Sequence, residues 1–151
     1  MSYQLMFEDT TKNMEIPMLV KETSSLLSAK WAAASGDFDP IHYDKEYALG
    51  QKLPSTVVNG RFKVALLCQF MTAYGGPAGR LKSLAVRHQG MDLVGNTISC
   101  KGLVIRKYEE RGESFIDCEI WIEDSQGKKT ANGSATIALP SRSKKPTAHG
   151  N

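Results

Sequence analysis

The chain has 151 residues, of which 41% are hydrophobic and 23% charged, and these fractions are typical of a globular protein rather than a disordered or fibrous one. Its longest apolar run, Val64–Cys68, is far shorter than the roughly 18 residues that a membrane span needs. The net charge of +3 equals the charge of Arg142, Lys144 and Lys145 in the tail, so the body is neutral and lacks the basic surface typical of nucleic-acid binding.

The first half of the chain has helical patterns after one early strand, which we place at residues 14–21. Helix-forming residues over 23–34 follow a Ser/Thr cluster, and Gly36 ends the segment. Leu26, Leu27, Lys30, Trp31 and Ala34 form an apolar stripe along this helix. A short helix at 44–49, capped by Asp44, precedes a long one at 57–74 that is apolar on most sides and therefore expected to be buried.

The second half has strand patterns after Gly79. We predict strands at 80–89, 96–108, 114–123 and 129–139, with turns at Gly95, Arg111–Gly112 and Gln126–Gly127. The third strand alternates strictly, with Ile116, Cys118, Ile120 and Ile122 on one face. These elements predict an α+β domain over residues 1–139, in which an antiparallel sheet wraps the helix at 57–74. The Ser-, Lys- and Pro-rich tail, residues 140–151, is expected to be disordered.

The start of the chain and its cysteines indicate its compartment. Residues 1–9 are acidic and polar, unlike a secretory signal. The three cysteines, Cys68, Cys100 and Cys118, are odd in number and lack the spacing of a zinc site. The sequence therefore favours an intracellular, cytoplasmic domain without a disulfide framework.

The densest polar cluster is the loop at residues 35–44. Asp37 and His42 flank a proline turn, so their side chains can converge, and a carboxylate beside an imidazole can position and activate water. The alternative is structural, because Asp39–Pro40 initiates turns and Asp44 caps helices. The spacing does not fit a calcium loop, and a metal site from Asp37, Asp39 and His42 has weak support.

A second cluster, Asn59-Gly60-Arg61, lies near the start of the long helix. A glycine at that place leaves backbone N–H groups uncovered at the positive end of the helix dipole, where they can hold a carbonyl oxygen that gains negative charge. The alternative is that Gly60 only permits close packing between helix and strand.

Together the two clusters resemble a known family. SGDFDPIHYDKEYA, then VVNGRFKVALL and a strand-rich stretch, is similar to the MaoC-like hydratase/dehydratase family, which includes the (R)-specific enoyl-CoA hydratases. The resemblance implies the hot dog fold and reversible hydration of a trans-2-enoyl thioester to a (3R)-hydroxyacyl thioester. It implies that Asp37 and His42 are the catalytic pair and that the N–H of Gly60 binds the thioester carbonyl oxygen. No metal or other cofactor is implied, and the sequence has no G-x-G-x-x-G motif.

Four residues depart from the pattern of this family. Asp39 replaces an asparagine, Asn59 and Arg61 replace the residues on either side of the helix-start glycine, and Cys68 replaces a pocket hydroxyl residue. These departures bear on substrate range and turnover more than on reaction type. Asn59, Arg61 and Cys68 are accordingly candidate substrate-binding residues.

The resemblance also implies partners. The substrate is expected to be an acyl thioester of coenzyme A or of acyl-carrier protein, with Arg61, Lys63 and Arg87 as candidate contacts for its phosphates. A homodimer is expected, or a heteromer with a related subunit. Two other functions remain open: a hot dog acyl-CoA thioesterase, and a non-catalytic partner subunit of a hydratase.

Overall fold

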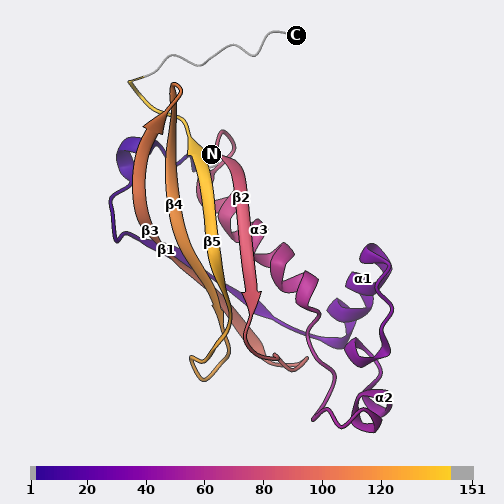
Figure 1. The fold of residues 1–151 in the computed structure, drawn as a ribbon. Coiled ribbons are helices and arrows are strands. Elements are labelled where there is room, and N and C mark those ends of the chain that lie inside the picture. Colours follow the sequence, from indigo (N-terminus) through magenta and orange to yellow (C-terminus); the bar gives the residue numbers. More distant parts are fainter. Residues whose placement is uncertain (1–2, 144–151) are drawn as a thin grey trace.

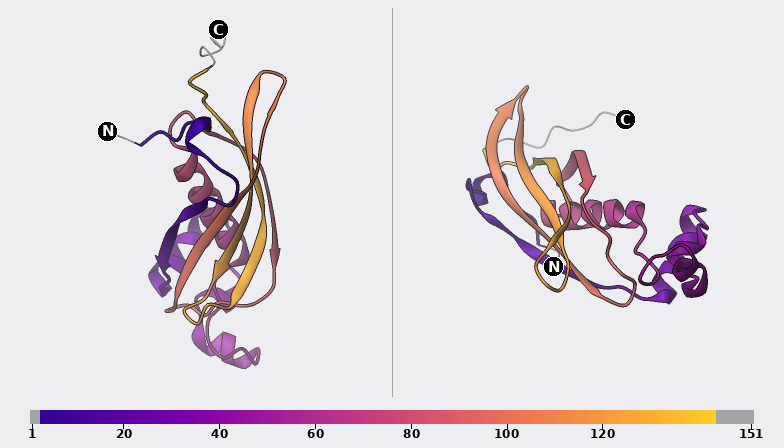
Figure 2. Two further views of the ribbon diagram at one scale, coloured as in Figure 1. Left: turned by 90° about the vertical axis from the view of Figure 1, so that its left-hand side faces the viewer. Right: turned by 60° about the horizontal axis from the view of Figure 1, so that its bottom comes forward.

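Five strands form one antiparallel sheet, and the longest helix, α3, lies across one of its faces (Figure 1, Figure 2). The computed structural model describes residues 3–143. The spatial order of the strands is β1-β3-β4-β5-β2. Their bounds are β1 Glu15–Glu22, β2 Arg80–His88, β3 Thr97–Glu110, β4 Glu113–Glu123 and β5 Lys129–Leu139. All five predicted strands are therefore confirmed, with ends that differ by at most two residues.

The turns between the strands follow from their sequences. Arg111 and Gly112 both have positive φ, 49° and 81°, which is the backbone of the two-residue turn that best matches the twist of a hairpin. They join β3 to β4 directly. Between β4 and β5, Asp124 accepts backbone hydrogen bonds from Gln126 and Lys128, and Gly127 adopts a φ of 78°. The hairpins thus form where the turn residues predicted them.

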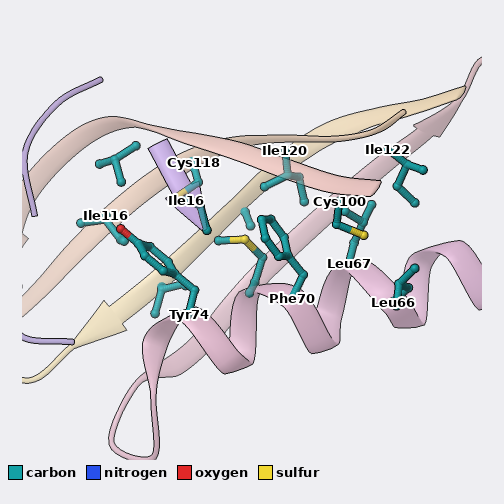
Figure 3. Close-up of a cluster of buried hydrophobic side chains, with 14 of the residues drawn as sticks. Ile16, Leu66, Leu67, Phe70, Tyr74, Cys100, Ile116, Cys118, Ile120 and Ile122 are labelled. Atoms are coloured by element: carbon teal, nitrogen blue, oxygen red, sulfur yellow. The ribbon is translucent and has the colours of Figure 1, made fainter. Parts of the chain in front are cut away.

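The core lies between the sheet and α3 (Gly60–Gly75) (Figure 3). On β4 the predicted alternation is confirmed, since Ile116, Cys118, Ile120 and Ile122 are all fully buried. The facing side chains of α3 are Leu66, Leu67, Phe70, Met71 and Tyr74. Burial of each large apolar side chain stabilises the fold by about 1.5–3 kcal/mol, so this interface holds α3 against the sheet.

Two expectations for the long helix are wrong. The helix begins at Gly60 rather than at residue 57, because Asn59 caps it in an extended conformation and Val57 bridges to Leu93. Its burial is one-sided, because Gln69 and Thr72 on the other side are exposed in the single chain. No helix within residues 3–143 combines the length and hydrophobicity that crossing a membrane would require.

Two shorter helices lie beyond the N-terminal end of α3, away from the sheet (Figure 1, Figure 2). Helix α1 spans Ser25–Ser35 and α2 spans Lys45–Gly50, with Ser24 and Asp44 as their side-chain caps. The predicted cap at Asp44 is confirmed. The predicted stripe on α1 is only partly correct, because Leu26 is 65% exposed.

Residues 140–143 pack against the short 3-10 helix η1 (Phe7–Asp9), which the sequence did not predict. The carbonyl of Pro140 accepts from Phe7 N, the hydroxyl of Ser141 donates to Glu8, and Arg142 pairs with Asp9 at 2.8 Å. The hydrogen bond from Ser141 is the largest cause that lowers the pKa of Glu8 to about 2. The expected disordered tail therefore does not begin at residue 140. The rest of that prediction concerns residues 144–151, which lie outside the described residues.

Candidate active site

The loop between α1 and α2 is shaped by glycine and aspartate. Gly36 ends α1 with a φ of 72°, in the left-handed region that favours glycine. Asp39 then accepts a hydrogen bond from Ile41 N at 3.2 Å and so caps the short 3-10 helix η2 (Pro40–His42). The turn-forming role of Asp39 and Pro40 is therefore confirmed. An asparagine at position 39 could accept the same bond through its side-chain oxygen.

Asp37 is held by two hydrogen bonds. Its Oδ2 accepts from the Asn59 side-chain amide at 2.9 Å, and its Oδ1 accepts from Asp39 N at 3.4 Å. The bond from Asn59 is the largest cause that lowers the pKa of Asp37, followed by the Asp39 N–H, with smaller attractions from His42 and Arg61. Asp37 is thus a fixed carboxylate that stays ionised at neutral pH.

Asn59 connects the loop to the long helix. Its Oδ1 accepts from Arg61 N at 2.8 Å and from Phe62 N at 3.3 Å, while its Nδ2 donates to Asp37. The backbone N–H of Lys63 bonds to the carbonyl of Asn59. Among the first four N–H groups of α3, only that of Gly60 has no acceptor within residues 3–143.

Close packing also favours a glycine at position 60. A Cβ built on Gly60 would lie 3.3 Å from Nε2 of His88, on β2. Contacts this short require the neighbour to shift, so the close approach of the imidazole favours glycine here. Both readings of this glycine, an uncovered N–H and close packing, therefore agree with the structure.

His42 has a defined tautomer. Its Nδ1 lies 2.8 Å from the carbonyl oxygen of Val57. Because a carbonyl oxygen only accepts, Nδ1 carries a proton, and in the neutral imidazole Nε2 then has the lone pair. The imidazole is thereby fixed as a hydrogen-bond acceptor and a candidate base at Nε2.

Asp37, His42 and Asn59 line one cavity. Its volume is about 10 Å³, close to the space that one water molecule occupies. The other lining residues are Thr23, Leu27, Ser28, Trp31, Val58 and Phe62. The structure thus brings Asp37 and His42 to the same small space. Trp31 was predicted only as part of an apolar stripe, although its position four residues after Leu27 places both on one face of α1.

The three other candidate binding residues lie apart from this cavity. Arg61 is exposed on the first turn of α3, yet close enough to lower the pKa of Asp37. Arg87 is exposed on the edge strand β2 and does not line the cavity. Cys68 lies on α3 two turns after Arg61, in a groove with Tyr3, Gln69 and Thr72. The structure does not bring Cys68 to Asp37 and His42.

The interpretation of Lys63 as a phosphate contact is wrong. Its ammonium is buried and lies 2.6 Å from Asp92, and the two side chains are only 3% and 1% exposed. It also donates to the carbonyls of Gly90 and Thr130 and to the Thr130 hydroxyl, which in turn donates to Asp92. The backbone carbonyl of Asp92 accepts from Val58 N at 2.8 Å. Lys63 therefore anchors the first turn of α3 to the loop between β2 and β3, and the bond from Val58 to Asp92 holds the segment before α3 to the same loop.

A metal site from Asp37, Asp39 and His42 has no support in the described part of the chain. Asp39 uses its Oδ1 for the turn, and His42 uses its Nδ1 for the Val57 carbonyl. No group of three or more His, Cys, Asp or Glu side chains within residues 3–143 has the arrangement of metal ligands.

Comparison with known proteins supports the resemblance seen in the sequence. The family described as MaoC like domain matches residues 10–132. No curated protein sequence matches the chain.

Solved structures share the fold over most of their length. An (R)-hydratase from A. caviae involved in PHA biosynthesis has a TM-score of 0.81 at 19% identity, covering 88% of this chain and 99% of that one. The R-hydratase PhaJ1 from Pseudomonas aeruginosa has a TM-score of 0.84 at 18% identity, covering 92% and 88%. The ChsH1–ChsH2 complex from Mycobacterium tuberculosis matches with a TM-score of 0.77 at 19% identity, covering 86% and 98%. The sheet and its central helix are therefore a hot dog fold.

Proposed function

The chain belongs to the MaoC-like dehydratase family, and we propose that it catalyses the reversible addition of water to a trans-2-enoyl thioester. The product is a (3R)-hydroxyacyl thioester, as in the family's (R)-specific hydratases. The observation that carries this proposal is the cavity of about 10 Å³ shared by Asp37 and His42, which has room for one water molecule. Both lining residues have side chains that can accept hydrogen bonds, and two acceptors are what a bound water needs for its two protons.

In the proposed reaction Asp37 and His42 act as a unit. Water donates to the Asp37 carboxylate and to Nε2 of His42. As the water oxygen bonds to C3 of the enoyl group, the pair takes one proton from it, and one proton is delivered to C2. Atoms and charge balance, because the proton lost by water equals the one gained by C2.

The start of α3 supplies the electrophilic part of the reaction. The thioester carbonyl accepts from the Gly60 N–H, which has no other acceptor within residues 3–143. This bond and the positive end of the helix dipole stabilise the negative charge that develops on the carbonyl oxygen while C2 has enolate character. The proposed reaction uses no metal or redox cofactor.

The carrier of the acyl group is coenzyme A or acyl-carrier protein. Arg61 is the favoured contact for a phosphate, because it is exposed and near Asp37. Arg87, also exposed, is a second candidate, on the edge strand β2. Lys63 is excluded from this role by its buried ion pair.

We propose that the protein is a dimer. Within residues 3–143 the outer strand β2 pairs only with β5, and one side of α3 is open. The chain has a mass of 16.6 kDa, and size-exclusion chromatography with light scattering should give twice that value. A monomer at micromolar concentration would contradict the proposal. Co-purification of a second hot dog chain in fixed stoichiometry would favour a heteromer, as in the ChsH1–ChsH2 complex.

The reaction is tested with crotonyl-CoA. Hydration removes the absorbance of the enoyl thioester without release of free thiol, whereas a thioesterase releases thiol. We expect loss of absorbance alone, and its abolition in the Asp37→Asn variant with folding confirmed by circular dichroism. A panel of short, long and ring-bearing enoyl thioesters then gives the substrate range. No turnover across this panel, with or without a partner subunit, would favour a non-catalytic role.

A further inference from the structure

The indole N–H of Trp31 is a buried donor without an acceptor. Nε1 of Trp31 has no hydrogen-bond partner within residues 3–143. The other tryptophan, Trp121, differs, since its Nε1 donates to Glu123 at 2.7 Å. Leaving a buried donor unpaired costs about 1–3 kcal/mol, and such groups are rare in folded proteins. This donor therefore points to an acceptor that arrives with a ligand.

The position of Trp31 places that ligand beside Asp37 and His42, and because neighbouring atoms cover Nε1, the ligand reaches the N–H as the surrounding side chains shift. Trp31 lines the same cavity as Asp37 and His42, and its ring packs edge-on against Phe62 with centroids 5.5 Å apart. A phenylalanine would keep this ring contact and would bury no N–H. Packing alone thus explains the ring but not its polar group.

The polar groups around the cavity define the chemistry of the acceptor. Asp37, an ionised carboxylate, and Nε2 of His42 accept hydrogen bonds, whereas the indole N–H can only donate. A molecule that donates twice and accepts once satisfies all three groups. Water has this pattern, with one lone pair left to form a bond to carbon.

We propose that Nε1–H of Trp31 donates to the oxygen that is added to, or removed from, C3 of the acyl group. In the hydration direction this oxygen belongs to the bound water, and in the dehydration direction it is the 3-hydroxyl of the substrate. Trp31 is then a residue that recognises the 3-hydroxyl and stabilises the charge that develops on it as the C–O bond breaks. This inference rests on the proposed hydratase function.

The test compares Trp31→Phe with Trp121→Phe, the same substitution outside the cavity. Binding of (R)-3-hydroxybutyryl-CoA and of butyryl-CoA, which lacks the hydroxyl, is measured for wild type and both variants. We expect Trp31→Phe to reduce the preference for the hydroxylated ligand about three- to tenfold, the range for one net hydrogen bond. It should also lower kcat/KM with crotonyl-CoA, while Trp121→Phe leaves both quantities unchanged.

A second measurement keeps Trp31 in place. The sequence has two tryptophans, so in Trp121→Phe the only indole emission comes from Trp31. The hydroxylated ligand should shift this emission more than butyryl-CoA does, because only the former offers the acceptor oxygen.

The outcomes separate the inference from the proposed function. If wild type hydrates crotonyl-CoA but Trp31→Phe keeps the full binding preference, the inference is wrong and the proposed function stands. Equal emission shifts with the two ligands would overturn it too, even if Trp31→Phe does not fold. If wild type hydrates no enoyl thioester, the proposed function and the inference built on it both fail.

Discussion

The side-chain amide of Asn59 donates to the carboxylate of Asp37 over 2.9 Å, joining two clusters that are 22 positions apart in the sequence. The same side chain caps α3 through its oxygen. One residue therefore sets both the start of the helix, where the Gly60 N–H lies, and the orientation of the carboxylate. Together with the bond from His42 to the Val57 carbonyl, this amide holds the two halves of the candidate active site in a fixed relation.

We expect Asn59→Ala to destabilise the fold and to raise the pKa of Asp37. Loss of the cap costs about 1 kcal/mol in the free energy of unfolding, measured in urea, and loss of the bond to Asp37 acts in the same direction. Since the Asn59 bond is the main cause that lowers the pKa of Asp37, this pKa rises toward 3.8. The carboxylate then takes up its proton at higher pH, so the acidic limb of the kcat/KM profile moves to higher pH.

Ser24→Ala is the matched control for this prediction. It also removes a helix cap, the bond from Leu27 N at the start of α1, but no bond to Asp37. It should reduce stability and leave the acidic limb in place. An Asn59→Ala profile identical to that of Ser24→Ala would show that the amide does not tune the carboxylate.

We expect the losses from Asp37→Asn and His42→Ala not to add. If both residues hold one water, each single variant loses general acid–base catalysis, a factor of at least about 100, and the double variant is little worse. The measurement is crotonyl-CoA hydration by the three proteins. Multiplied losses in the double variant would mean that the two residues act independently.

Asp39→Asn tests the same loop without removing the pair. Asparagine keeps the acceptor for Ile41 N and removes one negative charge near Asp37. Its hydration rate should equal or exceed that of wild type. A large loss would assign Asp39 a role beyond the turn.

The features that could be predicted from the sequence are those that depend on neighbouring residues. The alternation over Ile116–Ile122 and the Arg111–Gly112 turn follow from neighbouring residues, and both are confirmed. The chemical partners are not local. Nothing near Lys63 in sequence indicates a buried charge, because its counter-ion Asp92 is on a distant loop.

The helix faces show the same limit. A period of 3.6 residues locates Trp31 and Leu27 on one face of α1, but it does not say whether that face meets a core or a cavity. Only the packing of α1 against the start of α3 makes the indole N–H a possible ligand contact.

Removing one partner of the Lys63–Asp92 pair is expected to destabilise the fold strongly, whereas replacing both partners by apolar residues is expected to destabilise it much less. Lys63→Met leaves Asp92 as an unpaired buried charge and should cost about 3–5 kcal/mol in the free energy of unfolding. Lys63→Met combined with Asp92→Leu removes both charges and should recover most of that loss. As a control, Lys101→Met breaks a more exposed pair with Glu123 and should cost about 1 kcal/mol or less. A double variant as unstable as Lys63→Met would show that shape, rather than charge, sets the cost.

We expect His88 to make stability depend on pH below neutrality. Its ring lies over Gly60, and partial burial, followed by the positive charge of Lys63, lowers its pKa below 6.5. In the unfolded chain the imidazole takes up a proton near pH 6.5, whereas in the fold it does so only at lower pH. Between these two pKa values the unfolded state binds more protons, so stability falls as the pH is lowered through this window.

The measurement is thermal unfolding of wild type and His88→Phe at pH 7.5 and pH 5. Phenylalanine keeps an aromatic ring over Gly60 and cannot be protonated, and every other titratable group is the same in the two proteins, so the comparison isolates His88. The melting temperature of wild type should therefore fall further between pH 7.5 and pH 5 than that of the variant. Equal losses in the two proteins would mean that the imidazole is protonated as easily in the fold as in the unfolded chain, and that the contact with Gly60 leaves it in water.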